Sequence, residues 1–207
     1  MKAVVVRRFG GPEALEVADV ALPEPGVDQV RVRVQAAAVN PVDIATRAGW
    51  LAEHGLMVAN GDIGIGWDLA GVIDSVSPEN DRFEVGHRVI GMRNLLMAPI
   101  GAQAEQLVLD SDAVALAPRS ASPVKTSTLP LNGLTAAQAL DLLTLRVGQS
   151  LLVTGAAGAL GGFALELALR GLRTVAVAAP KTRSLHDNWA PPSSSRAQKA
   201  SGPPSDE

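Results

Sequence analysis

Residues 150–179 read SLLVTGAAGALGGFALELALRGLRTVAVAA, and this stretch decides the fold. Its first apolar run, 151–154, is typical of a buried strand. A turn with four glycines follows, then helix formers over 163–170, with Gly171 where a helix C-cap is expected. The apolar run 174–179 predicts a second strand. Strand, glycine turn, helix and strand together form the βαβ unit of a nucleotide-binding sheet.

The glycine turn is suited to a pyrophosphate. A helix N-terminus offers free N–H groups and the positive end of the helix dipole to an anion. A side chain at Gly158 would obstruct the close approach of the phosphates, and Gly161 lets the helix pack against the strand. Ala156 stands where the usual G-x-G-x-x-G pattern has its first glycine. The turn therefore predicts a dinucleotide site, and the alternative is a glycine-rich turn that only packs.

The end of the second strand distinguishes between cofactors. NAD-binding proteins usually carry an acidic residue there, which binds the ribose hydroxyls. This strand ends without one, and Lys181 and Arg183 follow. Two cations suit a 2′-phosphate, so we expect NADPH in preference to NADH. The alternative is that both cations are simply solvated.

Composition narrows the function classes. The chain has 207 residues, of which 47% are hydrophobic, so a sizeable core can form. A net charge of −3, with only 3% aromatic residues, argues against nucleic-acid binding. The absence of cysteine excludes disulfides and thiolate metal sites. We find no signal-peptide pattern and no apolar run of membrane-spanning length, and we expect a soluble cytoplasmic protein that does not bind membranes.

The first 118 residues carry short runs of strand type between frequent turn signals. The segment QVRVRVQ, residues 29–35, alternates strictly between polar and apolar residues, which predicts a half-buried antiparallel strand. Further strands are expected within residues 2–8, 14–20, 67–76, 83–90 and 102–109, a glycine-rich loop over 61–66 and a short helical turn over 44–48. This pattern predicts a compact β barrel or sandwich over residues 1–118.

The rest of the chain divides into three parts. Residues 119–149 are predicted to form a linker with a bridging helix over 130–145, which Thr135 opens. Residues 150–179 form the βαβ unit. Residues 180–207 hold five of the chain's 14 prolines and a run of serines, so we expect a disordered tail.

Five motifs occur in order along residues 1–179: NPVD at 40–43, GWDLAG at 66–71, GHRV at 86–89, LNGLTA at 131–136 and GAAGALG at 155–161. Together they resemble the medium-chain dehydrogenase/reductase superfamily, and most closely its zinc-independent quinone oxidoreductases, the zeta-crystallin-like branch. The resemblance implies a GroES-like β-barrel domain followed by a Rossmann domain, hence a mixed α+β and α/β fold. It also implies hydride transfer from NADPH to a quinone or an α,β-unsaturated carbonyl.

The resemblance assigns roles to individual residues. It implies that Asn40 and Asp43 lie on the wall of the active-site cleft, and that Thr135 and Asn132 lie near the nicotinamide. We take Asn40, Asp43 and Thr135 as catalytic candidates. The candidates for cofactor binding are Asn132, Thr135, Gly155, Ala156, Gly158, Ala159, Leu160, Gly161 and Lys181. The alternatives are that Asn40 only forms a turn and that Asp43 only caps the helix that follows it.

A metal site is not expected. The zinc-dependent relatives carry a cysteine near the position of Asn40 and a His-Glu pair where this chain has Trp67 and Asp68. Because the chain has no cysteine, a thiolate zinc site is excluded.

The Rossmann resemblance stops after one βαβ unit. A six-stranded Rossmann sheet needs four more strands, on the order of 100 residues. We expect a C-terminally truncated chain, such as a frameshift or premature stop produces, and sequencing of the downstream reading frame tests this hypothesis.

Three functions therefore stay open. The first is a quinone reductase whose sheet is completed by a homo-oligomer or a partner chain. The second is a non-catalytic fragment whose β domain serves as a binding or oligomerisation module, or a decayed product without function. The third is a zinc-free alcohol or enoyl reductase.

Overall fold

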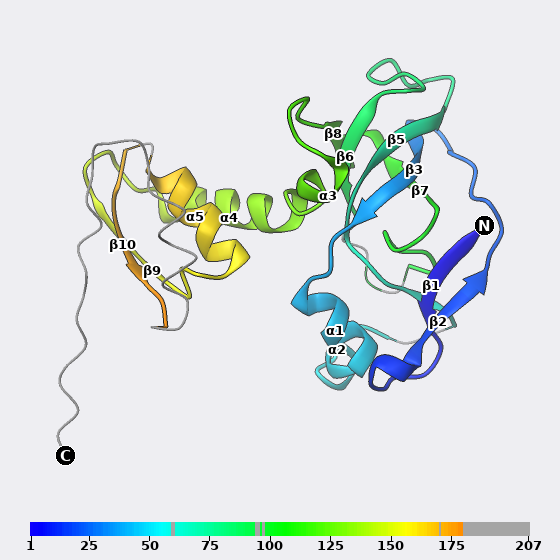
Figure 1. Cartoon of the computed structure of the whole chain (residues 1–207), viewed down its shortest axis with the longest axis horizontal. Helices are drawn as coiled ribbons and strands as arrows, with labels where there is room; N and C mark the ends of the chain where they lie inside the picture. Colours follow the sequence, from blue (N-terminus) through cyan, green and yellow to red (C-terminus); the bar gives the residue numbers. More distant parts are fainter. Residues whose placement is uncertain (59–60, 94–95, 97, 170, 180–207) are drawn as a thin grey trace. The chain divides into compact units, whose positions relative to one another are not determined.

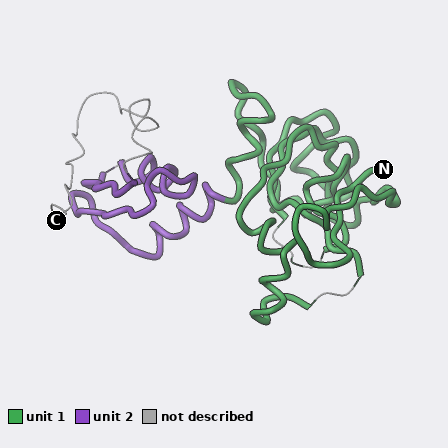
Figure 2. Tube along the Cα trace, turned by 60° about the horizontal axis from the view of Figure 1, so that its bottom comes forward, with its two compact units in different colours: residues 1–131 green, residues 132–207 purple. Residues whose placement is uncertain are grey.

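A computed structural model describes residues 1–58, 61–93, 96, 98–169 and 171–179. The chain divides into two compact units, Met1–Leu131 and Asn132–Glu207 (Figure 2). The boundary between the units falls inside helix α4 (Pro130–Leu143), whereas the sequence pattern ends the β domain at residue 118. The predicted disordered tail, residues 180–207, lies outside the described residues.

The larger sheet of unit 1 has five antiparallel strands in the order β7-β3-β5-β6-β8 (Figure 1). These strands are β3 (Gln29–Ala37), β5 (Asp68–Val76), β6 (Arg88–Met92), β7 (Gln106–Asp110) and β8 (Val114–Leu116). The alternating strand predicted from residues 29–35 is confirmed, because Val30 and Val32 are fully buried and β3 pairs antiparallel with both β5 and β7.

The smaller sheet of unit 1 has the order β2-β1-β4. Strands β1 (Lys2–Val6) and β2 (Leu15–Asp19) lie within the two strands predicted for residues 2–8 and 14–20, and they pair antiparallel with a 3-10 turn at Pro12–Ala14 between them. Strand β4 (Ile63–Gly64) was expected to be loop. The prediction was wrong there because these two residues pair with Val5 and Val6, which lie far away in the sequence.

Short helices connect the strands of unit 1. They are α1 (Pro41–Ala48), α2 (Trp50–Glu53), a 3-10 turn at Ser111–Ala113 and α3 (Pro123–Thr126). Helix α1 begins three residues before the predicted helical turn. Across the described residues, we find no helix with the length and apolar character that a membrane crossing needs.

Two apolar clusters fill unit 1. The first is formed mainly by strands of the five-stranded sheet and contains Val30, Val32, Leu69, Ile73, Phe83, Val89, Ala102, Leu107, Leu109 and Val114. The second joins β1, α2 and β4, and contains Val6, Leu51, Met57, Ile63 and Ile65. Each sheet therefore contributes to a buried core of its own.

Unit 2 contains the predicted βαβ arrangement. Strands β9 (Ser150–Thr154) and β10 (Arg173–Val177) pair in parallel, from Ser150 with Arg173 to Thr154 with Val177. Helix α5 (Ala159–Ala168) connects them and ends with Leu169 as its right-handed C-cap, so the expected cap at Gly171 was wrong. Thr135 lies inside α4 instead of opening it, because α4 begins at Pro130, a residue well suited to a first helical turn.

Candidate functional site

The predicted site residues lie at three places in the fold. Asn40 and Asp43 meet at the start of α1 in unit 1. Asn132 and Thr135 share helix α4, and the glycine turn 155–161 joins β9 to α5, both in unit 2. Each place is the beginning of a helix or its first turns, where backbone N–H groups need acceptors.

The buried side chain of Asp43 connects two backbone segments through hydrogen bonds. Its Oδ2 accepts the Asn40 N–H at 2.7 Å, and its Oδ1 accepts the Gly66 N–H at 3.0 Å. Gly66 has a φ of +97°, a left-handed conformation that favours glycine. Burial raises the pKa of Asp43, and the two N–H donors oppose that rise. The carboxylate thus ties the start of α1 to the loop before β5.

Asp68 is a second buried carboxyl group, and it holds the start of α4. It has no exposed surface, and its Oδ2 accepts the Leu131 N–H at 3.2 Å. Since the preceding residue, Pro130, has no N–H, this bond satisfies the first donor of α4. The other oxygen, Oδ1, is buried and has no hydrogen-bond partner within the described part of the chain.

Burial raises the pKa of Asp68 to about 6. The Leu131 N–H and the Asn40 side chain oppose this rise, whereas the charge of Asp43 adds to it. Asp43 accepts two backbone N–H groups, whereas Asp68 accepts one backbone N–H group. We call Asn40, Asp43, Gly66 and Asp68 the polar cluster.

The glycine turn has a tight bend at its first residue. Gly155 has a φ of +63°, and its carbonyl accepts the Gly158 N–H at 2.9 Å. Ala156 is almost fully buried and donates to the Val177 carbonyl at 3.1 Å, which ties the turn to β10. In the usual motif the first glycine, at the position of Ala156, makes the tight bend. Here Gly155 makes the bend, and this explains why alanine is tolerated at 156.

Gly161 and Gly158 have different roles in the turn. A Cβ on Gly161 would lie 2.5 Å from the Gly155 oxygen and 2.8 Å from the Ala156 Cα, so Gly161 allows α5 to pack against the turn. A Cβ on Gly158 would meet only the Gly155 oxygen, at 3.3 Å. The space in front of Gly158 is therefore open for a ligand.

The N-terminus of α5 fits an anion. Gly158 is its N-cap, and the Gly162 N–H donates to the Gly158 carbonyl at 2.9 Å. The N–H groups of Ala159, Leu160 and Gly161 precede this first intrahelical bond. Among the described residues, no side chain caps this end of the helix. These backbone donors, the helix dipole and the open space at Gly158 are what a dinucleotide pyrophosphate requires.

The two candidates on α4 are three residues apart, so they lie on neighbouring positions of one helix face. Asn132 is half-buried and Thr135 is exposed. Lys181, the expected contact for a 2′-phosphate, lies outside the described residues, as does Arg183.

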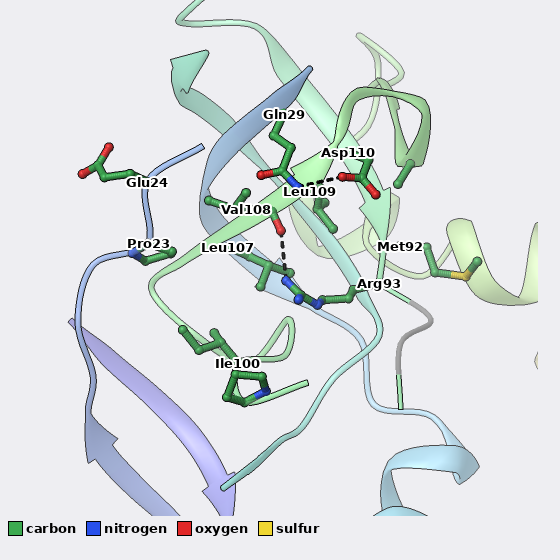
Figure 3. Close-up of a pocket in the computed structure, with 12 residues that line it drawn as sticks. Pro23, Glu24, Gln29, Met92, Arg93, Ile100, Leu107, Val108, Leu109 and Asp110 are labelled. Carbon is green, nitrogen blue, oxygen red and sulfur yellow. Dashed lines mark hydrogen bonds between the residues drawn. The ribbon is translucent and has the colours of Figure 1, made fainter. Parts of the chain in front are cut away.

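A pocket of about 370 Å³ opens on unit 1 and contains none of the predicted site residues (Figure 3). Apolar side chains such as Leu107 line it together with Gln29, Arg93 and Asp110. The Arg93 guanidinium donates to the Val108 carbonyl at 3.0 Å, and the Gln29 amide donates to the Asp110 carboxylate at 2.8 Å. Burial lowers the pKa of Arg93. The lining's Gln29 amide and one Arg93 nitrogen are bonded to the protein itself, and none of the predicted site residues lines the pocket, so we do not assign it to the predicted chemistry.

The described residues contain no group of three or more histidine, aspartate or glutamate side chains that would hold a metal ion. Sequence reasoning missed Asp68 as a candidate site residue, although GWDLAG was among the quoted motifs. Its partner Leu131 is 63 positions away. The available signal was an acidic residue at the position of the zinc-dependent relatives' His-Glu pair.

Comparison with known proteins identifies the lineage. The alcohol dehydrogenase GroES-like domain family matches residues 26–119, all within unit 1. A quinone oxidoreductase of Pseudomonas aeruginosa is 34% identical over 168 residues, which are 81% of this chain and 49% of that protein. The chain spans about half the length of the curated relatives it matches.

Solved structures agree with the sequence matches. An alcohol dehydrogenase superfamily protein from Novosphingobium aromaticivorans has a TM-score of 0.82 at 31% identity, over 92% of this chain and 57% of that one. The quinone oxidoreductase from Thermus thermophilus, solved also in complex with NADPH, has a TM-score of 0.71 at 32% identity, over 88% of this chain and 55% of that one. With its GroES-like half-barrel followed by a short βαβ portion, the chain belongs to the medium-chain dehydrogenase/reductase superfamily, in the quinone oxidoreductase branch.

Proposed function

We propose that this chain binds NADPH at the glycine turn and serves hydride transfer to a quinone or an α,β-unsaturated carbonyl. The observation that carries the proposal is the uncapped N-terminus of α5 behind the open space at Gly158. The relative from Thermus thermophilus, solved in complex with NADPH, supports the choice of cofactor. The membership of the quinone oxidoreductase branch supports the substrate class.

The residues of this chain bind and orient the reactants. The backbone N–H groups of Ala159, Leu160 and Gly161 hold the pyrophosphate at the positive end of α5. Asn132 and Thr135 supply polar groups toward the nicotinamide, and Lys181 neutralises the 2′-phosphate. When bound, NADPH supplies the hydride, which is the difficult chemical step.

Within the polar cluster, we assign different roles to the two catalytic candidates. Both oxygens of Asp43 accept backbone N–H groups, so Asp43 holds the Asn40 backbone in place. Asn40, as the N-cap of α1, is the residue that contacts the substrate carbonyl. Under this assignment, the hydrogen bond by which Asp43 caps α1 is also the bond that positions Asn40 for the substrate.

The proposal is tested by titrating the purified chain with NADPH and with NADH, following cofactor fluorescence. The informative variant is Gly158→Val. The backbone of Gly158 is extended, with φ −78° and ψ 164°, so valine fits the fold while its side chain blocks the phosphates. Gly26→Val is a matched control, because a Cβ there also has its closest contact at 3.3 Å, with the Gln29 Oε1.

We expect saturable NADPH binding by the wild type and by Gly26→Val, weaker binding of NADH, and loss of binding in Gly158→Val. Absence of NADPH binding by a folded wild-type chain would reject the proposal. Turnover assays with a quinone, an enone, an aldehyde and an enoyl thioester then separate a quinone reductase from an alcohol or enoyl reductase.

The second candidate function is a non-catalytic binding or oligomerisation module formed by unit 1. It is favoured by one observation: the family match lies in unit 1, while the described part of unit 2 has two strands and one connecting helix. Light scattering distinguishes the two proposals further. NADPH binding by a defined homo-oligomer, or only after a partner chain is added, supports a sheet completed by another chain, whereas oligomers without cofactor binding support the module.

A further inference from the structure

Asp68 is held firmly in place by the sheet of unit 1. It begins β5, the central strand of the five-stranded sheet, and pairs with Met92 on β6. On the other side, its carbonyl accepts the Ala38 N–H at 3.2 Å. Because its backbone is bonded on both sides and its side chain has no exposed surface, the position of its carboxylate is set by the sheet.

The Asp68 carboxylate has a hydrogen-bond partner outside the sheet. The Asp68 Oδ2 accepts the Leu131 N–H, which belongs to the first turn of α4. Leu131 directly precedes Asn132 and lies one helical turn before Thr135. A charged acceptor at this end of a helix is favoured by the free N–H groups and by the helix dipole.

We infer that Asp68 is a positioning residue that fixes the first turn of α4, and with it Asn132 and Thr135, for cofactor binding. The last part of this inference rests on the proposed function, whereas the attachment of α4 to β5 does not. Asp68 itself is buried and touches neither cofactor nor substrate in this role.

The attachment is tested on the full chain without cofactor, by hydrogen exchange of peptides that cover residues 128–138. Asp68→Ala removes the acceptor, and we expect exchange there to rise about tenfold, since a hydrogen bond to a charged group is lost. Asp68→Asn keeps an acceptor oxygen, and we expect it to restore slow exchange to within about threefold. Asp74→Ala, on the same strand but bonded to Arg31, is the control and leaves these peptides unchanged.

The positioning role is tested by NADPH titration of the same variants. We expect Asp68→Ala to weaken NADPH binding about tenfold while the protein remains fully folded, and Asp68→Asn to restore the binding. A merely structural contribution would not produce this difference between two folded variants.

Each outcome decides one part of the inference. Unchanged exchange in Asp68→Ala overturns the attachment. Faster exchange with unchanged NADPH affinity overturns the positioning role and leaves the proposed function standing. A wild type that does not bind NADPH rejects the proposed function and the cofactor clause, while exchange still decides the attachment. If Asp68→Ala does not fold, Asp68→Leu removes the acceptor instead, with a side chain of similar size that fills the buried site.

Discussion

Strands β5 and β9 show how differently the two units use an apolar segment. The first four residues of β5 are buried, and Leu69 is fully enclosed. No residue of β9 is fully buried, and Leu152 is 61% exposed. The reason is the number of neighbours: β5 lies between β3 and β6, whereas β9 pairs with β10 alone in the described sheet. An apolar run therefore predicts a strand, and its neighbours decide whether the strand becomes core.

The two units also differ in how many apolar side chains they bury. Unit 1 has two clusters of buried apolar side chains, drawn from both of its sheets. The buried apolar residues around the glycine turn and α5 are few: Ala156, Leu165 and Ala168. Parallel strands normally bury both faces, but in the described part of unit 2 the apolar side chains of β9 and β10 stay partly or largely exposed, so they stabilise it less.

The largest expected effect compares one leucine from each unit. Leu69→Ala should lower the free energy of unfolding by about 2–5 kcal/mol, because it leaves a cavity in the core. Leu152→Ala removes a side chain that is largely exposed and should cost less than about 1 kcal/mol. Urea denaturation of both variants measures the difference. An equal loss of unfolding free energy in the two variants would contradict the difference in burial between Leu69 and Leu152.

The next effect concerns the pH dependence of unit 1. The pKa of Asp68 is about 6 in the folded chain against an ordinary value of 3.8, so the folded state binds the proton more tightly. The contribution of Asp68 to stability is thus full below about pH 4 and is lost as the pH rises through 6, an effect of about 3 kcal/mol. Asp43, on α1, is the charged group that acts on it.

The pH effect is measured as a difference between proteins. The unfolding free energy of the wild type minus that of Asp68→Asn should fall between pH 4 and pH 7, because the variant cannot ionise there. Other groups that titrate in both proteins largely cancel in the difference. A flat difference profile would contradict the buried, proton-binding state of Asp68.

A smaller effect tests the packing of unit 2. Gly161→Ala places a Cβ 2.5 Å from the Gly155 oxygen and should destabilise the turn and α5 by about 1–3 kcal/mol. Gly158→Ala has a closest contact of 3.3 Å and should leave the fold nearly unchanged. Hydrogen exchange in peptides from α5 reads both variants. Equal protection in the two would mean that α5 does not pack on the turn as described.

The smallest effect concerns the surface of unit 1. The Lys2 ammonium and the Asp19 carboxylate lie 2.7 Å apart, but both side chains are more than half exposed. Solvent screens such pairs, so Lys2→Met should not shift the thermal midpoint measurably. A clear drop in the midpoint would show that the stability of unit 1 depends on its surface and not only on its interior.

Local patterns predict much of the fold, because the signal and the structure lie in the same few residues. The alternation in QVRVRVQ predicts β3, and the glycine turn between two apolar runs predicts the βαβ unit. The start of α1 was placed too late: in NPVD, proline fits the first helical position, and Asp43 accepts the N–H of the N-cap Asn40. The NPVD motif is thus the start of the helix.

What the sequence could not predict depends on distant partners. Strand β4 is two residues long and exists because it pairs with Val5 and Val6. Asp68 matters at the candidate site because Leu131 lies beside it, and no local pattern reveals a contact across 63 positions. The glycine turn, by contrast, was predictable as a candidate site because its chemistry lies within seven consecutive residues.

The pairing of the first strand has a consequence for synthesis of the chain. The Val4 N–H donates to the Gln103 carbonyl at 2.8 Å, and the Lys2 N–H to the Glu105 carboxylate at 2.8 Å. The β1–β2 hairpin can form as soon as Asp19 has left the ribosome, but these later partners are about 100 residues behind. At ordinary translation rates of 5–20 residues per second, the nascent strand waits roughly 5–20 s for them. During that interval its valines depend on the hairpin, or on chaperones, for protection from water.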